Sequence, residues 1–307
     1  MQVHQHLDQL PRFENSVITI GTFDGVHKGH QKVIEALKEE AQKIQGQSVL
    51  ITFHPHPRKI VNGNFSLQLL NTLDEKITLL SQKGIDHLVI VPFTAEFADQ
   101  PADDYIQSFL IDKFHPHTII IGYDHHFGKD RQGNFRLLEE KASLYNYHLI
   151  EIPKHVVNEI GISSTKIRHA ILESDIDTAN ELLGYDFFFT GRVVRGDQIG
   201  RKISYPTANL EYTNNDKIHL GHGVYAVTVR VGGEEKKGML SIGNRPTIDG
   251  IDEKVEVNIF DFDQEIYGQE ITLTVKKFLR HQEKYDSLEE LTQQLALDKE
   301  NSLKWLE

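Results

Sequence analysis

The sequence predicts an α/β protein of two domains: an N-terminal doubly wound parallel sheet and a C-terminal antiparallel β-barrel that ends in a helix. The length of 307 residues fits two domains of roughly 150 residues each. Strand-like and helical segments alternate over residues 17–183, which is typical of βαβ units and a parallel sheet. Over residues 187–278 strand-like segments follow one another without helices, which indicates an antiparallel sheet or small barrel.

Short apolar segments define the strands of the first sheet, and apolar residues at helical spacing define the helices between them. Strands are expected at residues 17–20, 48–53, 87–91 and 118–122. The spacing of Val33, Ile34, Leu37, Ala41 and Ile44 predicts the helix after the first strand. Further helices are expected at residues 67–83 (ending at Gly84), 102–114, 163–172 and 178–183.

The second domain is predicted from five segments that are rich in β-branched and aromatic residues. They span residues 187–194, 224–231, 236–242, 255–260 and 271–278. Gly232 and Gly233 predict a hairpin turn between the second and third of them. Helical periodicity returns only with Leu288, Leu291, Leu295 and Trp305. We therefore expect a boundary near residues 184–187, with domains at 1–185 and 186–307.

Composition excludes several classes of protein. Apolar residues make up 39% and charged residues 25%, as in soluble globular domains that bury a core. No run of 18 apolar residues exists, so no membrane span is expected, and the N-terminus lacks the layout of a secretory signal. The absence of cysteine excludes disulfides and thiolate chemistry. These observations predict a cytoplasmic protein, either a monomer or a weak homo-oligomer.

The charge balance limits the partners. A formal net charge of -12 is unsuited to general nucleic-acid binding, which needs a basic face. Anionic nucleotides can still bind where backbone N–H groups and a few cations dominate one pocket. The 17 histidines include close pairs, but no Cys or HExxH pattern supports a structural metal site.

The first candidate site is the segment from Gly21 to His30, which follows a strand and opens a helix. The helix N-terminus offers unpaired N–H groups and a partial positive charge. Gly25 and Gly29 allow the backbone to approach a phosphate. His27 and His30 project from one side of the first turn, where they can donate hydrogen bonds to a phosphate. A tight βα turn with surface histidines would also fit these residues.

Further candidate residues lie later in the first domain. Ser163, Ser164 and Thr165 begin a helix, and Arg168 follows one turn in, so that hydroxyls, free N–H groups and a guanidinium could hold phosphates. An ordinary serine-rich helix cap would fit equally well. Two segments follow strands at the edge where α/β sheets bind ligands, and they contribute His54, Pro55, Asp124 and Phe127.

The second candidate site combines a glycine-rich loop with a polar strand. The loop contains Gly191, Arg192, Gly196 and Gly200 and could wrap an ATP phosphate chain. Thr207 and Asn209 alternate by two, so both oxygens face one side of an extended segment and could bind Mg²⁺ together with phosphate oxygens. A glycine-rich hairpin without a ligand is the alternative.

These motifs resemble those of the bacterial bifunctional riboflavin kinase/FMN adenylyltransferase family, also called FAD synthetases. Residues 21–31 are similar to the family's form of the HxGH nucleotidyltransferase motif, and residues 162–168 to its ISSTxIR segment. The resemblance implies that His27 and His30 stabilise the transition state as FMN attacks the α-phosphorus of ATP. It implies flavin contacts for His54, Pro55, Asp124 and Phe127, and ATP contacts for Gly21, Phe23, Asp24, His27, His30, Ser164, Thr165 and Arg168.

The C-terminal half resembles the family's riboflavin kinase module, in which a glycine-rich loop precedes the sequence PTAN. The resemblance implies that Gly191, Arg192, Gly196 and Gly200 bind ATP, that Thr207 and Asn209 bind Mg·ATP, and that Glu256 is the base near the riboflavin 5′-hydroxyl. His125 stands where the family usually has Phe, and Ser204 where it usually has Gly. The alternatives are a chain that retains only one of the two activities and a flavin-binding regulator.

Overall fold

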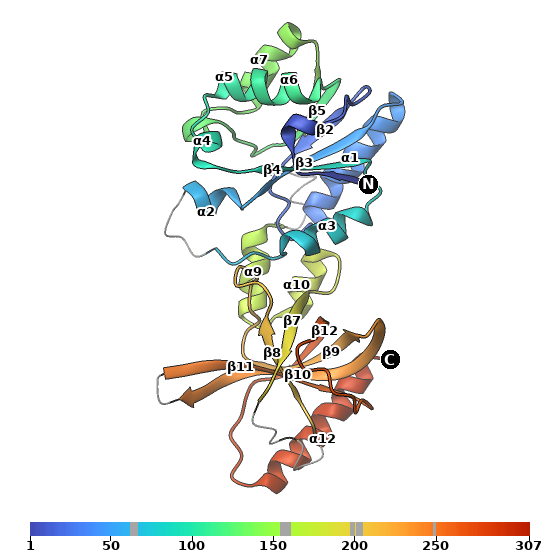
Figure 1. Cartoon of the computed structure of the whole chain (residues 1–307), viewed down its shortest axis with the longest axis vertical. Coiled ribbons are helices and arrows are strands. Elements are labelled where there is room, and N and C mark those ends of the chain that lie inside the picture. Colours follow the sequence, from blue (N-terminus) through green and yellow to red (C-terminus); the bar gives the residue numbers. More distant parts are fainter. Residues whose placement is uncertain (62–66, 154–160, 197–199, 201–204, 248–249) are drawn as a thin grey trace. The chain divides into compact units, whose positions relative to one another are not determined.

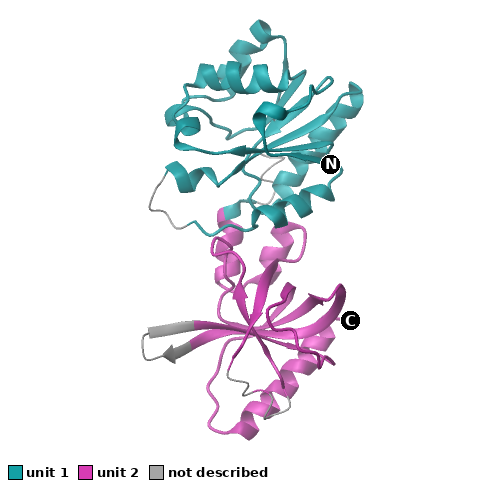
Figure 2. Cartoon of the chain, viewed as in Figure 1, with its two compact units in different colours: residues 1–164 teal, residues 165–307 magenta. Residues whose placement is uncertain are grey.

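The computed structural model describes residues 1–61, 67–153, 161–196, 200, 205–247 and 250–307, with side chains omitted at 245–247 and 250–252. The chain divides into two compact units, residues 1–164 and residues 165–307 (Figure 2). None of the described helices is both long and apolar enough to cross a membrane.

The first unit is built on a six-stranded sheet in the order β1-β4-β3-β2-β5-β6 (Figure 1). Every pair of neighbouring strands is parallel, which confirms the predicted doubly wound sheet. The strands are β1 (Gln2–His4), β2 (Val17–Ile20), β3 (Ser48–His54), β4 (His87–Pro92), β5 (Thr118–Gly122) and β6 (His148–Ile152). The edge strands β1 and β6 are additions to the four predicted ones.

The strand order creates a topological switch point beside β2. Strands β3 and β4 continue the sheet on one side of β2, whereas β5 and β6 continue it on the other. The connections from β2 and from β5 therefore leave in opposite directions, and ligands of open α/β sheets bind at the carboxyl ends of the strands at such a point. The predicted phosphate motif begins at Gly21, directly after β2.

Helices cover both faces of this sheet (Figure 1). Helices α1 (Lys28–Lys43) and α3 (Leu73–Ser81) lie on one face; α5 (Ala102–Asp104), the π-helical segment η2 (Tyr105–Ile111), α6 (Asp112–Phe114) and α7 (Phe135–Tyr145) lie on the other. The latter face buries a core cluster in which Phe109 and Phe114 meet Ile18, Val49 and Ile119. Shorter helices are η1 (Leu7–Gln9), α2 (Pro57–Val61), α4 (Ala95–Ala98) and η3 (Lys129–Arg131).

Two predicted helices differ from the observed ones. The helix expected at 67–83 begins only at Leu73, because Thr72 caps it and forms a reciprocal capping box with Glu75. The helix expected at 102–114 is present, but its middle part is a π-helix rather than an α-helix.

The second unit contains a closed barrel in the order β10-β11-β8-β7-β12-β9. All its neighbouring strands pair in antiparallel fashion, as predicted. Helices α9 (Ser164–Leu172) and α10 (Ile176–Leu183) precede the barrel and α12 (Leu288–Trp305) follows it. The strands are β7 (Phe188–Val194), β8 (Ala208–Tyr212), β9 (Gly223–Val231), β10 (Glu234–Thr247), β11 (Gly250–Ile259) and β12 (Glu270–Arg280).

Candidate functional sites

The two motif histidines stand at the carboxyl edge of the first sheet, where β2 passes into α1. His27 is the N-cap of α1, and its Nδ1 accepts a hydrogen bond from the backbone N–H of His30 at 3.3 Å. A ring nitrogen that accepts carries no proton, so neutral His27 has its proton on Nε2. The two rings stack, with centroids 3.7 Å apart and an angle of 14° between their planes.

His30 has an unsatisfied ring nitrogen. Its Nδ1 is buried and has no hydrogen-bond partner among the described residues. Burial, then the charges of His27 and Lys76, hold the pKa of His30 well below the ordinary value of 6.5. The imidazole is therefore neutral at physiological pH. A buried polar atom without a partner is uncommon in folded proteins and is typical of a group that a ligand completes.

The turn between β2 and α1 has a strained backbone. Phe23 and Val26 have positive φ angles of 46° and 38°, which residues with side chains rarely adopt. Such strain persists only where surrounding contacts impose it, and it concentrates at functional sites. Asp24 supplies contacts of this kind: its buried Oδ1 accepts hydrogen bonds from the backbone N–H groups of Leu70 at 3.0 Å and Asn71 at 3.4 Å.

The remaining predicted ATP residues of the first motif pack around this turn. Phe23 is buried, with its ring centroid 5.1 Å from that of His30, so it forms one wall beside the imidazole. Gly21 donates its N–H to Ile51 O at 3.0 Å, and a Cβ added there would lie 3.1 Å from the Phe23 ring. The carboxylate of Asp24 has partners inside the protein. Any ATP contact of these three residues stays a prediction.

Ser164 connects the second predicted segment to the same turn. Its hydroxyl donates a hydrogen bond to the backbone carbonyl of Asp24 at 2.9 Å. This hydrogen bond joins the start of α9 to the turn after β2, although the two residues are 140 positions apart in the sequence. Thr165 and Arg168 belong to α9 in the second unit, where Thr165 is exposed and Arg168 half-buried. Their phosphate contacts stay a prediction.

The predicted flavin residues follow β3 and β5 at the carboxyl edge of the sheet. His54 ends β3 and is exposed, Pro55 is half-buried, and Asp124 is exposed just after β5. Phe127 instead packs into the core, stacked on Tyr105 with centroids 4.7 Å apart. These positions are compatible with a flavin site at this edge, but contact with flavin stays a prediction for all four.

His125, where the family usually has Phe, contributes a second unsatisfied nitrogen. Its Nε2 is buried without a hydrogen-bond partner among the described residues. Burial lowers the pKa of His125 to about 4, with smaller contributions from His126 and Arg131. The ring is therefore neutral at physiological pH and occupies an aromatic position 5.8 Å from Phe127.

In the second unit the strand register brings the predicted kinase residues together. Asn209 on β8 lies opposite Val194 on β7 and opposite Glu256 on β11. Directly opposed residues of antiparallel strands share one face of the sheet. The neighbours Leu210 and Val257 are buried in the barrel, so Asn209 and Glu256, both half-buried, point to its outer side.

Gly196 and Gly200, two described glycines of the glycine-rich segment, approach Asn209 and Tyr205 closely. A Cβ on Gly196 would lie 2.2 Å from Nδ2 of Asn209, which is possible for no residue but glycine unless the amide moves. A Cβ on Gly200 would lie 2.1 Å from the carbonyl oxygen of Tyr205, whose N–H donates to Gly200 O at 2.9 Å. A side chain at Gly196 or Gly200 would therefore displace Asn209 or Tyr205. The family departure at Ser204 lies outside the described residues.

Two predicted loop residues lie apart from this cluster. Gly191 is buried in β7 opposite Tyr212, and its α-carbon faces the β8 backbone. Arg192 is exposed and forms an ion pair with Glu270 on β12 at 3.0 Å. Their ATP contacts stay a prediction.

Two buried polar residues that the sequence analysis did not single out support the sites. Asn258 on β11 donates from Nδ2 to the carbonyl oxygen of Pro206 at 2.6 Å, which anchors the segment that carries Thr207 and Asn209. Lys76 on α3 donates from Nζ to the carbonyl oxygen of Thr22 at 2.6 Å, one residue before the strained Phe23. Only the three-dimensional contacts distinguish them from ordinary strand and helix residues.

The oxygen donors of the second unit suit a hard cation. Thr207 is exposed just before β8, and its hydroxyl, the Asn209 amide and the Glu256 carboxylate are the ligand types that Mg²⁺ binds. The described residues contain no group of three or more His, Cys, Asp or Glu that could hold a metal ion. Mg²⁺ at this position would take its remaining ligands from nucleotide phosphate oxygens and water.

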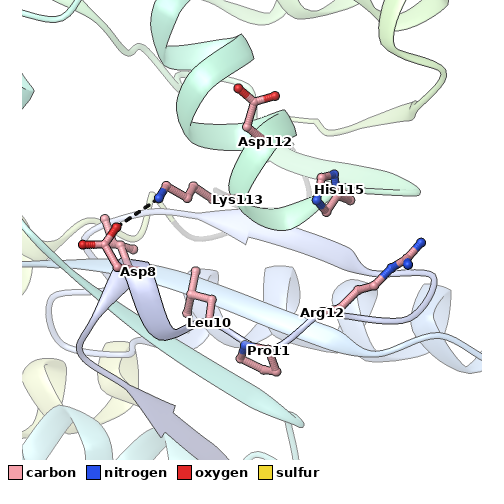
Figure 3. Close-up of a pocket in the computed structure, with 8 residues that line it drawn as sticks. Asp8, Leu10, Pro11, Arg12, Asp112, Lys113 and His115 are labelled. Carbon is pink, nitrogen blue, oxygen red and sulfur yellow. Dashed lines mark hydrogen bonds and ion pairs between the residues drawn. The ribbon is translucent and has the colours of Figure 1, made fainter.

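A pocket of about 410 Å³ lies elsewhere in the first unit (Figure 3). Its lining includes Arg12, Lys113 and His115, and Lys113 forms an ion pair with Asp8 at 3.2 Å. The lining residues precede β2 and β5, so the pocket is at the amino edge of the sheet. Ligands of open α/β sheets bind at the carboxyl edge, where the histidines stand.

Comparisons with known proteins identify both halves. A family model described as FAD synthetase matches residues 10–166, and one described as riboflavin kinase matches residues 183–306. A solved structure from Streptococcus pneumoniae, described as a macrolide-efflux protein, shares the fold with a TM-score of 0.89 and 30% identity, covering 99% of each chain.

Curated relatives carry the two activities in one name. The bifunctional riboflavin kinase/FMN adenylyltransferase of Escherichia coli is 34% identical over 294 residues, which cover 95% of this chain and 93% of the relative. The enzymes of the same name from Buchnera aphidicola (Schizaphis graminum) and Listeria monocytogenes are 38% and 36% identical, covering 92% and 94% of this chain and 92% and 91% of the relatives. With both family models in one polypeptide, the chain belongs to the family of bifunctional riboflavin kinase/FMN adenylyltransferases.

Proposed function

We propose that residues 186–307 phosphorylate riboflavin to FMN with ATP, and that residues 1–185 then transfer AMP from ATP to FMN, giving FAD and pyrophosphate. The observation that carries the assignment of the first site is the stacked pair His27 and His30 at the N-terminus of α1, beside the topological switch point. It combines a helix N-terminus with an unsatisfied buried nitrogen where α/β sheets bind nucleotides.

In the first site an oxygen of the FMN phosphate attacks the α-phosphorus of ATP, and the bond to the β-phosphate oxygen breaks. His27 and His30 donate hydrogen bonds to the phosphate oxygens as charge develops. Gly21, Phe23 and Asp24 shape the nucleotide side of the pocket, and Ser164, Thr165 and Arg168 hold the outer phosphates. His54, Pro55, Asp124 and Phe127 contribute to the flavin side. The attack is direct, without a covalent enzyme intermediate.

In the second site Glu256 accepts the proton of the riboflavin 5′-hydroxyl as that oxygen attacks the γ-phosphorus of ATP, and the bond from the γ-phosphorus to the β-phosphate oxygen breaks to release ADP. Gly191, Arg192, Gly196 and Gly200 surround the phosphate chain. Thr207 and Asn209 would hold the Mg²⁺ that accompanies ATP, and the ion would supply charge neutralisation for the transferred group. The cross-strand pair Asn209–Glu256 supports this arrangement, because it sets the metal-side amide beside the proposed base.

The proposal includes the setting of the enzyme. Its partners are the small molecules ATP, riboflavin and FMN, with no nucleic acid and no membrane, and it works in the cytoplasm as a monomer or weak homo-oligomer. The net charge of -12 and the absence of cysteine support this setting.

Incubation of the full chain with riboflavin and Mg·ATP, followed by chromatography of the flavins, tests the proposal. FMN together with FAD is the expected product mixture. If riboflavin yields FMN but no FAD, only the kinase site is active. If FAD forms only when FMN is supplied in place of riboflavin, only the first site is active. Riboflavin that remains unchanged, although it binds, would favour a flavin-binding regulator and overturn the proposal.

A further inference from the structure

Asn258 is a buried polar residue on the outer side of the barrel. It lies two positions after Glu256 on β11, so the two side chains share a face of that strand. Only 6% of its surface is exposed, and its Nδ2 donates to the carbonyl oxygen of Pro206 at 2.6 Å. A buried amide without such a partner would cost free energy. The hydrogen bond therefore links β11 to the segment just before β8.

The backbone pairing between β8 and β11 ends one residue short of Thr207. Its last pair is Ala208 opposite Val257, and β8 begins at Ala208. Pro206 has no N–H group, so it cannot donate to a longer ladder. One further step of the same register would place Thr207 beside Asn258.

The side chain of Asn258 takes over where this pairing ends. The peptide group between Pro206 and Thr207 is planar, so the hydrogen bond to its oxygen also fixes the plane from which Thr207 continues. The N–H of Tyr205, one residue earlier, donates to the carbonyl oxygen of Gly200 at 2.9 Å, on the glycine-rich segment rather than on a barrel strand. Asn258 thus ties the peptide before Thr207 to the barrel wall.

Filling the outer face of β11 does not require an asparagine. Phe260 comes two positions further along and has 5% of its surface exposed, so an apolar side chain is accommodated there. An apolar residue at position 258 would also avoid burying an amide. What asparagine adds is a donor for the Pro206 carbonyl, directly before the residue that we propose for the Mg·ATP site.

We infer that Asn258 is a positioning residue for riboflavin phosphorylation, which through Pro206 holds Thr207 where its hydroxyl reaches Mg·ATP. The inference rests on the proposed function of the second site. Asn258 acts through Thr207 and requires no contact of its own with a substrate.

The substitution Asn258→Asp tests the donor. An ionised carboxylate has nearly the shape of the amide but only accepts hydrogen bonds, so it cannot hold a carbonyl oxygen. Asn258→Leu is a second variant, which lacks the donor without burying a charge. The matched control is Asn180→Asp, because Nδ2 of Asn180 donates to the carbonyl oxygen of Val275 at 3.0 Å from α10, a helix without proposed kinase residues.

Stabilisation by Mg·ATP provides a measurement that does not depend on turnover. In the absence of flavin, Mg·ATP should raise the thermal unfolding midpoint of the second unit, followed by the fluorescence of Trp305, because a ligand stabilises the fold that binds it. The rise should be smaller in both Asn258 variants and equal to that of wild type in Asn180→Asp. A lower midpoint without ligand, combined with an unchanged rise, would mean a structural role only and would contradict the inference.

Kinetics of riboflavin phosphorylation by the full chain separate the two substrates. The kcat/KM for Mg·ATP should fall about 10–100-fold in both Asn258 variants, the usual effect of removing a group that orients a metal ligand. The KM for riboflavin should stay within about twofold, because the pairing of Asn209 with Glu256 does not use the Asn258 side chain. The Asn180→Asp values should match those of wild type.

A wild-type kcat/KM for Mg·ATP in either Asn258 variant would overturn the inference. Loss of the folded second unit in both variants would also overturn it, because Asn258 would then serve the stability of the barrel. Wild-type chain that makes no FMN from riboflavin would instead overturn the proposed function of the site.

Discussion

Asn209 and Glu256 lie directly opposite each other on the antiparallel strands β8 and β11, with side chains on the outer side of the barrel. Opposed residues of this kind have Cβ atoms about 4.5–5.5 Å apart. One side chain is the proposed metal-side amide and the other the proposed base. The barrel register thus sets the separation between the proposed metal-side amide and the proposed base.

Asn209→Ala should abolish FMN formation from riboflavin while FMN still becomes FAD. The amide oxygen is lost from the proposed Mg·ATP site of the second domain, whereas the residues of the first site are untouched. Chromatography of the flavins after incubation with riboflavin, or with FMN, measures the two steps separately. Loss of both steps would refute the independence of the two sites.

Glu256→Gln should lower kcat for riboflavin phosphorylation by about 10²–10⁴-fold, the usual contribution of a positioned general base. Glutamine keeps the shape and a hydrogen bond but cannot accept the proton. The KM for ATP should change little. Steady-state kinetics at saturating riboflavin provide the comparison, and a wild-type kcat would remove Glu256 from the reaction.

Gly196→Ala should impair the kinase by pushing the Asn209 amide aside, because the new Cβ would lie 2.2 Å from its nitrogen. A displacement of about 1 Å at a catalytic group can cost roughly 100-fold in rate. In the Asn209→Ala background, where turnover is abolished, the same substitution should cause no further loss of ATP affinity in a binding titration, because the clashing amide is gone. Additive losses in the double variant would show that Gly196 acts independently of Asn209.

The parallel sheet and the barrel could both be predicted because their strands are apolar and β-branched. Val17–Ile20 is buried along its whole length, which a run of four such residues already suggests. Strand β6 was missed because its residues, His148–Ile152, are mostly exposed or half-buried at the edge of the sheet. An edge strand of mixed polarity carries little periodic signal.

The start of α3 shows where apolar spacing misleads. Leu67, Leu69 and Leu70 are buried, so they extend the apparent helical pattern, yet they precede the helix. The sequence contained the correct signal, since Thr72 and Glu75 have the spacing of a capping box.

The motif residues of both sites could be proposed from the sequence, but their supports could not. Lys76 and Asn258 have the spacing of ordinary helix and strand residues. Their roles follow from contacts with Thr22 and Pro206, which lie 54 and 52 positions away. Contacts at such separations depend on tertiary packing, which a single sequence does not encode in a readable pattern.

His30→Ala should stop FAD formation while FMN accumulates from riboflavin. The substitution removes the neutral imidazole that we propose to stabilise charge at the α-phosphate, and it leaves the second domain intact. The loss should be about 10²–10³-fold in kcat, as for removal of one donor from a site that stabilises developing charge. FAD synthesis at the wild-type rate would exclude His30 from the transition state.

His125→Phe should remove part of the acid sensitivity of the first unit. Burial lowers the pKa of His125 from 6.5 to about 4, so the unfolded chain binds a proton at this residue before the folded chain does. Above pH 6.5 His125 is neutral in both the folded and the unfolded chain, so its protonation costs no stability. As the pH falls from about 6.5 to about 4, protonation of the unfolded chain at His125 lowers the free energy of unfolding. Phenylalanine takes up no proton, and it also removes the unsatisfied Nε2.

The stability advantage of His125→Phe over wild type should therefore be small at pH 7.5 and grow steadily between pH 6.5 and pH 4. Calorimetric unfolding at pH 7.5, 6.0 and 5.0 measures the first unit. The fluorescence of Trp305, the chain's single tryptophan, reports on the second unit and should give the same midpoint in both proteins at each pH. A difference between the two proteins that does not vary with pH would mean that His125 takes up a proton equally in the folded and unfolded states, which would contradict the lowered pKa that we infer from its buried Nε2.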